Sequence, residues 1–134
     1  MGILLQGLEH VEGQAEGRRP TVLLAEDDRA LRRYLEVVLG RAGYKVLTAS
    51  DGLEAMKVLL SDEVDAVVTD AMMPHLSGQE LCRFVREHPK LKGTPVVLLS
   101  GDSSSRAEDA GADLYLSKPV HAEELAASLA RLLA

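Results

Sequence analysis

Residues 65–78 read DAVVTDAMMPHLSG, and this stretch decides the fold of the chain. Its apolar, β-branched run at 66–69 ends on the carboxylate of Asp70, and a loop containing proline and glycine follows. Such a continuous apolar run is typical of a parallel strand that is covered on both faces. Ligands of open parallel sheets bind beyond the carboxyl ends of the strands. The sequence therefore indicates a functional role for Asp70, the alternative being a turn or helix-capping aspartate.

Four similar apolar runs occur elsewhere in the chain, and stretches with helical spacing separate most of them. The expected strands cover residues 21–25, 45–49, 66–69, 96–99 and 114–117. The expected helices begin after Asp28, Asp51 and Ser77, and the last helix covers residues 122–133. Ser77 and Glu80 have the spacing of a capping box. Strands that alternate with helices predict an α/β fold with a parallel five-stranded sheet and right-handed crossovers.

Residues 1–19 differ in pattern from the rest of the chain. Apolar residues with the spacing of a short coiled-coil seam are Met1, Leu4, Leu8, Val11 and Ala15. Glycines in the same segment oppose a helix, since each costs roughly 1 kcal/mol relative to alanine. We expect residues 1–19 to be an N-terminal extension or linker, partly helical or disordered, and residues 20–134 to form the domain.

The composition narrows the class of protein. The 134 residues suffice for one domain with a sizeable core, and with 46% apolar but only 3% aromatic residues that core is aliphatic. A net charge of −6 argues against direct binding to nucleic acid, and we expect Arg32 and Arg33 to lie on a solvated helix face. No apolar run approaches the ~20 residues that cross a bilayer. The single cysteine, Cys82, suits a reducing cytoplasm and is expected in the core.

Polar side chains follow four of the five expected strands. They are Glu26, Asp27, Asp70, Ser100 and Lys118. Clustered carboxylates repel one another unless a cation lies among them, and carboxylate oxygens are ligands that Mg²⁺ prefers. A carboxylate can also attack a phosphoryl group to give an aspartyl-phosphate, with Lys118 and Ser100 stabilising the phosphoryl oxygens. The strand ends therefore predict a magnesium-dependent phosphoryl site.

The same residues belong to a set of motifs that runs in order from residue 20 to the end of the chain. The motifs are VLLAEDD at 22–28, DAMMP at 70–74 with Gly78, SG at 100–101, AGADLY at 110–115 and KP at 118–119. In this set the chain resembles the response-regulator receiver domain of two-component signalling. The resemblance implies a flavodoxin-like (βα)5 three-layer sandwich with strand order 2-1-3-4-5.

The resemblance also implies a function and a metal site. Asp70 would accept a phosphoryl group from a histidine kinase or a histidine phosphotransfer protein, which changes the surface offered to an output partner. Asp27, Asp70 and the main-chain carbonyl of Met72 would bind Mg²⁺, and Glu26 would act through a metal-bound water. Such a domain catalyses its own phosphorylation and dephosphorylation without being a conventional enzyme.

Three further residues receive roles from the resemblance. Lys118 would contact the phosphoryl group, and the Lys118-Pro119 bond would be cis. Ser100 and Tyr115 would be the switch pair, with the hydroxyl moving toward the phosphoryl group and the tyrosine turning inward behind it. These two residues are 15 positions apart (115 − 100), about four fewer than in the family, or roughly one helical turn. We therefore expect a shortened fourth helix.

Two enzyme classes fit the sequence less well. A phosphatase with an aspartate nucleophile would carry a second acid two positions after it, where this chain has Met72. A nucleotide-binding enzyme would have a glycine-rich phosphate loop after a strand, and the sequence has none. A receiver-like interaction module that acts without phosphorylation is the remaining alternative.

Overall fold

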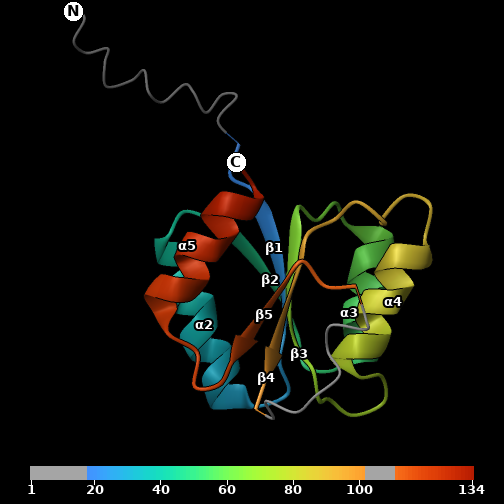
Figure 1. The fold of residues 1–134 in the computed structure, drawn as a ribbon, viewed down its shortest axis with the longest axis horizontal. Coiled ribbons are helices and arrows are strands. Elements are labelled where there is room, and N and C mark those ends of the chain that lie inside the picture. Colours follow the sequence, from blue (N-terminus) through green and yellow to red (C-terminus); the bar gives the residue numbers. More distant parts are fainter. Residues whose placement is uncertain (1–17, 102–110) are drawn as a thin grey trace, which may run out of the picture.

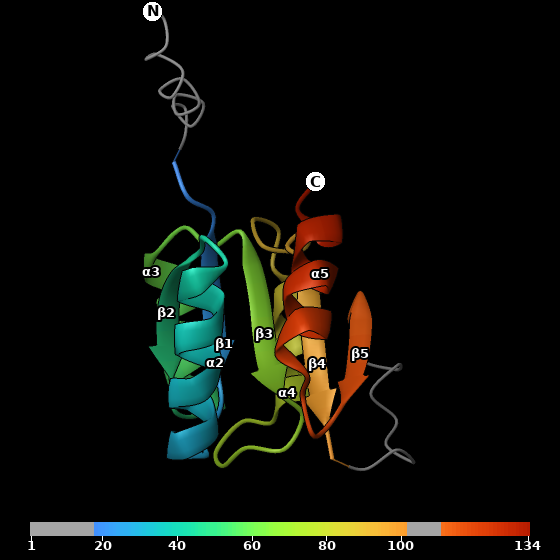
Figure 2. The same cartoon turned by 90° about the vertical axis from the view of Figure 1, so that its left-hand side faces the viewer.

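Five parallel strands form the middle layer of the protein, in the order β2-β1-β3-β4-β5. The structure is a computed structural model, and it describes residues 18–101 and 111–134. The strands are β1 (Thr21–Ala25), β2 (Lys45–Ala49), β3 (Ala66–Asp70), β4 (Val96–Ser100) and β5 (Leu114–Ser117). Their arrowheads point to the same edge of the sheet (Figure 2). The predicted strand order is confirmed.

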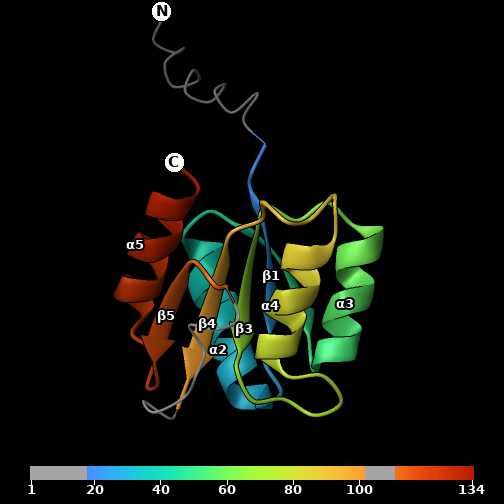
Figure 3. The same cartoon turned by 45° about the vertical axis from the view of Figure 1, so that its right-hand side comes forward.

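Helices cover both faces of the sheet. Those in the described ranges are α2 (Arg29–Arg41), α3 (Gly52–Ser61), α4 (Gly78–Glu87) and α5 (Ala122–Leu132). Helices α2 and α5 lie on one face and α3 and α4 on the other, which gives the predicted three-layer sandwich (Figures 1 and 3). None of these helices is long and apolar enough to cross a membrane. The expected shortened fourth helix and most of the N-terminal extension fall on residues 102–110 and 1–17, outside the described ranges.

The predicted element boundaries differ from the structure by a single residue. Strands β3 and β4 each extend one residue further and so include Asp70 and Ser100, and α5 ends at Leu132 rather than at residue 133. The Lys118-Pro119 bond directly after β5 is cis, as the resemblance implied.

Strand β3 is buried along its whole length, because both of its faces carry apolar residues. Val67 packs with Leu23 in the core beneath α3 and α4, and Val68 packs with Leu24 in the core beneath α2 and α5. Each buried side chain of this size contributes about 1.5–3 kcal/mol to folding. Cys82 is buried in the first of these cores, as expected.

Three helices begin at the carboxyl edge of the sheet, at the predicted positions, and each has a side-chain cap. The Asp28 carboxylate accepts hydrogen bonds from two main-chain N–H groups in the first turn of α2, and Asp51 does the same for one N–H group of α3. Ser77 and Glu80 form a complete capping box at the start of α4. These caps fix the helix starts beside the strand ends that carry the polar residues.

Arg86 of α4 joins that helix to the connections that lead into β4 and β5. Its Nε donates a hydrogen bond to the carbonyl of Gly111 at 2.8 Å. Its Nη1 donates to the carbonyls of Thr94 and Lys92 at 2.8 and 3.1 Å, and its Nη2 lies 2.7 Å from Asp113 Oδ2. The sequence pattern did not predict this group of contacts.

We predict that Arg86→Met lowers the free energy of unfolding by about 2 kcal/mol, because hydrogen bonds to a charged group contribute ~1.5–3 kcal/mol. Urea unfolding measures the change. The control is Arg83→Met, which removes the same charge from an exposed position on the same helix. Equal stabilities of the two variants would contradict the stabilising role assigned to Arg86.

Candidate functional site

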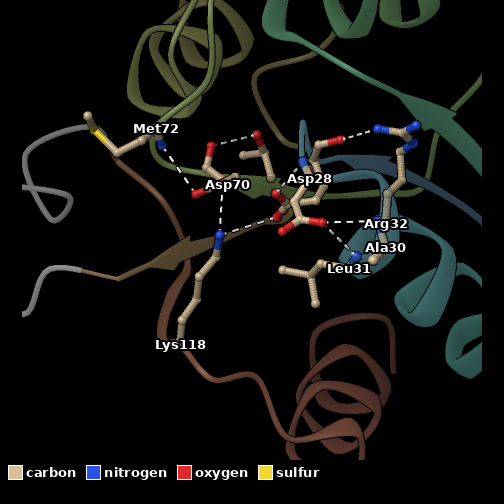
Figure 4. Close-up of polar contacts among 9 residues, drawn as sticks. Asp28, Ala30, Leu31, Arg32, Asp70, Met72 and Lys118 are labelled. Carbon is tan, nitrogen blue, oxygen red and sulfur yellow. Dashed lines mark hydrogen bonds and ion pairs between the residues drawn. The ribbon is translucent and has the colours of Figure 1, made fainter.

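The carboxyl ends of β1, β3 and β5 bring Glu26, Asp70 and Lys118 into contact. Lys118 Nζ donates a hydrogen bond to Asp70 Oδ2 at 2.8 Å and lies 3.4 Å from Glu26 Oε1 (Figure 4). Glu26 is fully buried and Asp70 is 5% exposed. The predicted convergence of these three residues is therefore present, with the lysine already paired to the proposed acceptor.

Asp27 completes a cluster of three carboxylates. Glu26, Asp27 and Asp70 each offer an oxygen, and these oxygens lie within 4.8 Å of one another. Asp27 is exposed, so the cluster opens to solvent on one side. Among the described residues, Glu26 Oε1 receives no hydrogen bond although it is buried, and its contact with Lys118 is an ion pair. This donor set fits a hard divalent cation such as Mg²⁺, which binds carboxylate oxygens and water.

The pKa values of Glu26 and Lys118 reflect both their burial and the surplus of negative charge in the cluster. Burial, reinforced by the charge of Asp70, raises the pKa of Glu26 to about 7, although a hydrogen bond from Asp28 N–H and the charge of Lys118 oppose the shift. Burial lowers the pKa of Lys118, but its contacts with Asp70 and Glu26 outweigh burial and raise that pKa above its usual value. The lysine is thus held as a cation beside carboxylates that it balances incompletely.

The loop after β3 is fixed against the starts of two helices. Met72 N–H donates a hydrogen bond to Asp70 Oδ1 at 3.2 Å, so both carboxylate oxygens of Asp70 have partners. A Cβ at Gly78 would overlap the carbonyl of Asp70, and a Cβ at Gly52 would overlap the carbonyl of Leu76. Only glycine allows α3 and α4 to approach the loop this closely.

His75 lies in the same loop and has a positive φ of 70°. Its Nδ1 lies 3.2 Å from Asp51 Oδ2 at the start of α3. Hydrogen bonding from the N–H of Glu54, helped by His75, lowers the pKa of Asp51. The contact joins the loop after Asp70 to the turn that follows β2.

The remaining predicted residues surround this centre. Ser100 ends β4 one residue after Leu99, which lies opposite Asp70, and the Ser100 carbonyl accepts a hydrogen bond from Lys118 N–H at 2.9 Å. Met72 is 71% exposed, and its side chain points away from the Asp70 carboxylate (Figure 4). Tyr115 lies on the edge strand β5, opposite Leu98 of β4, and is 36% exposed. Because Tyr115 is partly exposed in this structure, the inward turn of its ring stays a prediction.

Arg32 corrects one expectation from the sequence. Its Nη1 donates a hydrogen bond to the main-chain carbonyl of Glu26 at 2.8 Å, so Arg32 is half-buried beside the site rather than on a solvated face. Arg33 is exposed, as expected. One feature of the sequence indicates where Arg32 lies. It follows the capping residue Asp28 by one helical turn, so it lies on the side of α2 that is next to the end of β1.

We predict that Glu26→Gln, in buffer with a chelator, stabilises the protein at pH 8 and that this advantage shrinks as pH falls below 7 and disappears below pH 4.5. The unfolded state releases the Glu26 proton near its ordinary pKa of 4.5, but the folded state holds it up to about 7. Wild-type stability therefore falls as pH rises between these values, whereas glutamine cannot titrate. Thermal unfolding at several pH values measures the difference, and a pH-independent difference would contradict this account.

Comparisons with known sequences all indicate the same protein family. Residues 22–130 match the profile of the response regulator receiver domain. The chain is 44% identical over 120 residues to the response regulator MprA of Mycobacterium tuberculosis, covering 84% of this chain and 50% of that protein. It is 37% identical over 123 residues to the transcriptional regulatory protein GltR of Pseudomonas aeruginosa, covering 89% and 50%. The chain thus spans about half the length of these curated relatives.

Solved structures agree. A response regulator from Chloroflexus aurantiacus has a TM-score of 0.83 and 36% identity, covering 87% of this chain and 98% of that one. The receiver domain of a sensor histidine kinase from Pseudomonas aeruginosa, solved with magnesium in its active-site cleft, has a TM-score of 0.81 and 27% identity, covering 87% and 98%. The fold, the carboxylate cluster and these matches together show that the chain belongs to the response regulator receiver domain family of two-component systems.

Proposed function

We propose that Asp70 accepts a phosphoryl group from a histidine kinase or a histidine phosphotransfer protein in a Mg²⁺-dependent reaction. The observation that carries the proposal is the pairing of the Lys118 ammonium with Asp70, at the open edge of a cluster formed with Glu26 and Asp27. Residues 20–134 would form the receiver unit, and phosphorylation would change the surface that it offers to an output partner.

The chemistry follows from the groups around Asp70. A carboxylate oxygen of Asp70 attacks the phosphorus atom, and the bond from phosphorus to the histidine nitrogen of the donor breaks, leaving its electron pair on that nitrogen. Lys118, which is already within 2.8 Å of Asp70 Oδ2, then balances the added negative charge. Preorganised charges of this kind lower the barrier because they need no rearrangement during the reaction.

Asp27, Asp70 and the main-chain carbonyl of Met72 would hold Mg²⁺, with Glu26 acting through a bound water. When bound, the cation neutralises charge on the transferring phosphoryl oxygens. The orphaned oxygen of buried Glu26 supports this assignment, since a metal-bound water would supply its missing hydrogen bond.

The response would begin at Ser100 and Tyr115. The Ser100 hydroxyl would move toward the phosphoryl group, and the Tyr115 ring would turn inward behind it. The half-buried position of Ser100 at the end of β4 and the exposure of Tyr115 one strand away support this pairing, because the ring has surface left to bury. Output partners would bind the altered surface; the net charge of −6 disfavours nucleic acid as a direct partner.

We predict a mass gain of one phosphoryl group per chain when the protein is incubated with acetyl phosphate and Mg²⁺, measured by intact-mass spectrometry. Asp70→Asn abolishes the gain because the amide is not a nucleophile. Asp62→Asn, an exposed position remote from the site, retains it. Wild type that gains no mass, or an undiminished gain in Asp70→Asn, would refute Asp70 as the acceptor and favour an interaction module that acts without phosphorylation.

We predict that the phosphoryl group is lost slowly, over hours rather than seconds. Met72 lies two positions after Asp70, and its exposed apolar side chain would turn over the phosphoryl group and hinder water from approaching the phosphorus in line. Decay of the phosphorylated mass after removal of the donor measures the rate. Met72→Asn is expected to accelerate the loss and Met72→Leu, which stays apolar, to preserve it; similar rates in both variants would show that Met72 does not shield the site.

A further inference from the structure

Two neighbouring arginines of α2 have different environments. The side chain of Arg33 is 73% exposed, and its guanidinium lies 3.4 Å from Glu36 Oε1. Arg32 is half-buried, and its Nη1 donates a hydrogen bond to the Glu26 carbonyl at 2.8 Å (Figure 4). The same helix therefore presents one solvated arginine and one that reaches the carboxyl end of β1.

The Arg32 contact fixes a particular peptide unit. The carbonyl of Glu26 belongs to the peptide bond that joins Glu26 to Asp27, and this unit is planar and rigid. On either side, Glu26 N–H donates to the carbonyl of Ala49 at 3.0 Å, and Glu26 Oε2 accepts from Asp28 N–H at 3.0 Å. Holding the carbonyl therefore sets the direction in which the chain leaves β1, and with it the position of Asp27.

Arg32 also contributes positive charge near the start of α3. Hydrogen bonds from the N–H and hydroxyl groups of Ser50, at 2.7 and 2.8 Å, lower the pKa of Glu54, and the charge of Arg32 acts in the same direction. Figure 4 shows Arg32 and Lys118 approaching the strand ends from opposite sides. The Lys118 ammonium contacts the carboxylate of Asp70. Among the described residues, the Arg32 guanidinium instead donates its hydrogen bond to a main-chain carbonyl.

We propose that Arg32 is a positioning residue, which holds the Glu26–Asp27 peptide so that both carboxylates converge with Asp70 on a divalent cation. The proposal rests on the proposed function, because it assigns to that site the residue that orders its metal ligands. A guanidinium suits this role because it stays charged at every physiological pH and carries several donors in a fixed plane.

The test measures Mg²⁺ binding directly, by isothermal titration calorimetry. Arg32→Met keeps the apolar stem of the side chain and removes its donors, and it is expected to weaken Mg²⁺ binding by about tenfold or more, as is usual for partners that orient metal ligands. The matched control is Arg33→Met, which removes the same charge from the adjacent residue and leaves the affinity unchanged. Equal affinities of Arg32→Met and wild type would overturn the proposal.

A second measurement separates positioning from loss of stability. In the metal-free protein, the amide NMR signals of Asp27 and Asp28 are expected to shift in Arg32→Met but not in Arg33→Met. With acetyl phosphate, the Mg²⁺ concentration for half-maximal phosphorylation rises while the rate at saturating Mg²⁺ is kept. Unshifted signals, or a lower saturating rate at unchanged Mg²⁺ dependence, would contradict a positioning role.

If Arg32→Met does not fold, Arg32→Lys provides the test instead. Lysine keeps the charge on a side chain one atom shorter, so the variant is expected to fold and still to lose Mg²⁺ affinity; wild-type affinity in Arg32→Lys would overturn the proposal. The outcome is distinguishable from failure of the proposed function. Wild type that binds Mg²⁺ but gains no phosphoryl mass refutes the acceptor, whereas an Arg32→Met variant that binds Mg²⁺ normally refutes only the positioning role.

Discussion

The central constraint on this structure is the repulsion among three carboxylates, whose oxygens lie within 4.8 Å of one another at one edge of the sheet. Two of the three, Glu26 and Asp70, are almost completely buried, and buried charges are costly unless they are paired. Lys118 and nearby N–H groups offset part of this cost, but they leave one oxygen of Glu26 without a hydrogen bond from the described residues. The carboxylate cluster therefore has the charge and the oxygen ligands to bind a divalent cation.

The fold supplies the means to keep such a cluster in place. Strands β1 and β3 are adjacent in the sheet, so their carboxyl ends deliver the acidic residues side by side. The apolar cores on the two faces provide stabilisation that offsets the cost of burying Glu26 and Asp70 at this edge. Capped helix starts and the close approach at Gly78 then restrict the loop that follows Asp70. A phosphoryl group added at Asp70, as proposed, would therefore meet an edge whose main chain is already restrained.

Much of this was predictable from the sequence, and the reason is topological. In an alternating βα chain every strand ends at the same edge, so residues such as Glu26, Asp70 and Lys118 can meet there although they are far apart along the chain. The caps at Asp28 and Ser77 were predictable because their hydrogen bonds are local. The hydrogen-bond partners of Arg32 and Arg86 were not, because long side chains have several rotatable bonds and bind groups on other elements. The position of Arg32 one turn after Asp28 indicates its side of α2 but not its partner.

The location of a bound divalent cation tests whether the carboxylate cluster is a metal site. Mn²⁺ prefers the same oxygen ligands as Mg²⁺, and a crystal soaked with Mn²⁺ reveals the ion by its anomalous scattering. The account predicts one strong peak bonded to the carboxylates of Asp27 and Asp70, with Glu26 behind it. A crystal at saturating Mn²⁺ that shows no peak among these residues, with Lys118 still paired to Asp70, would contradict it.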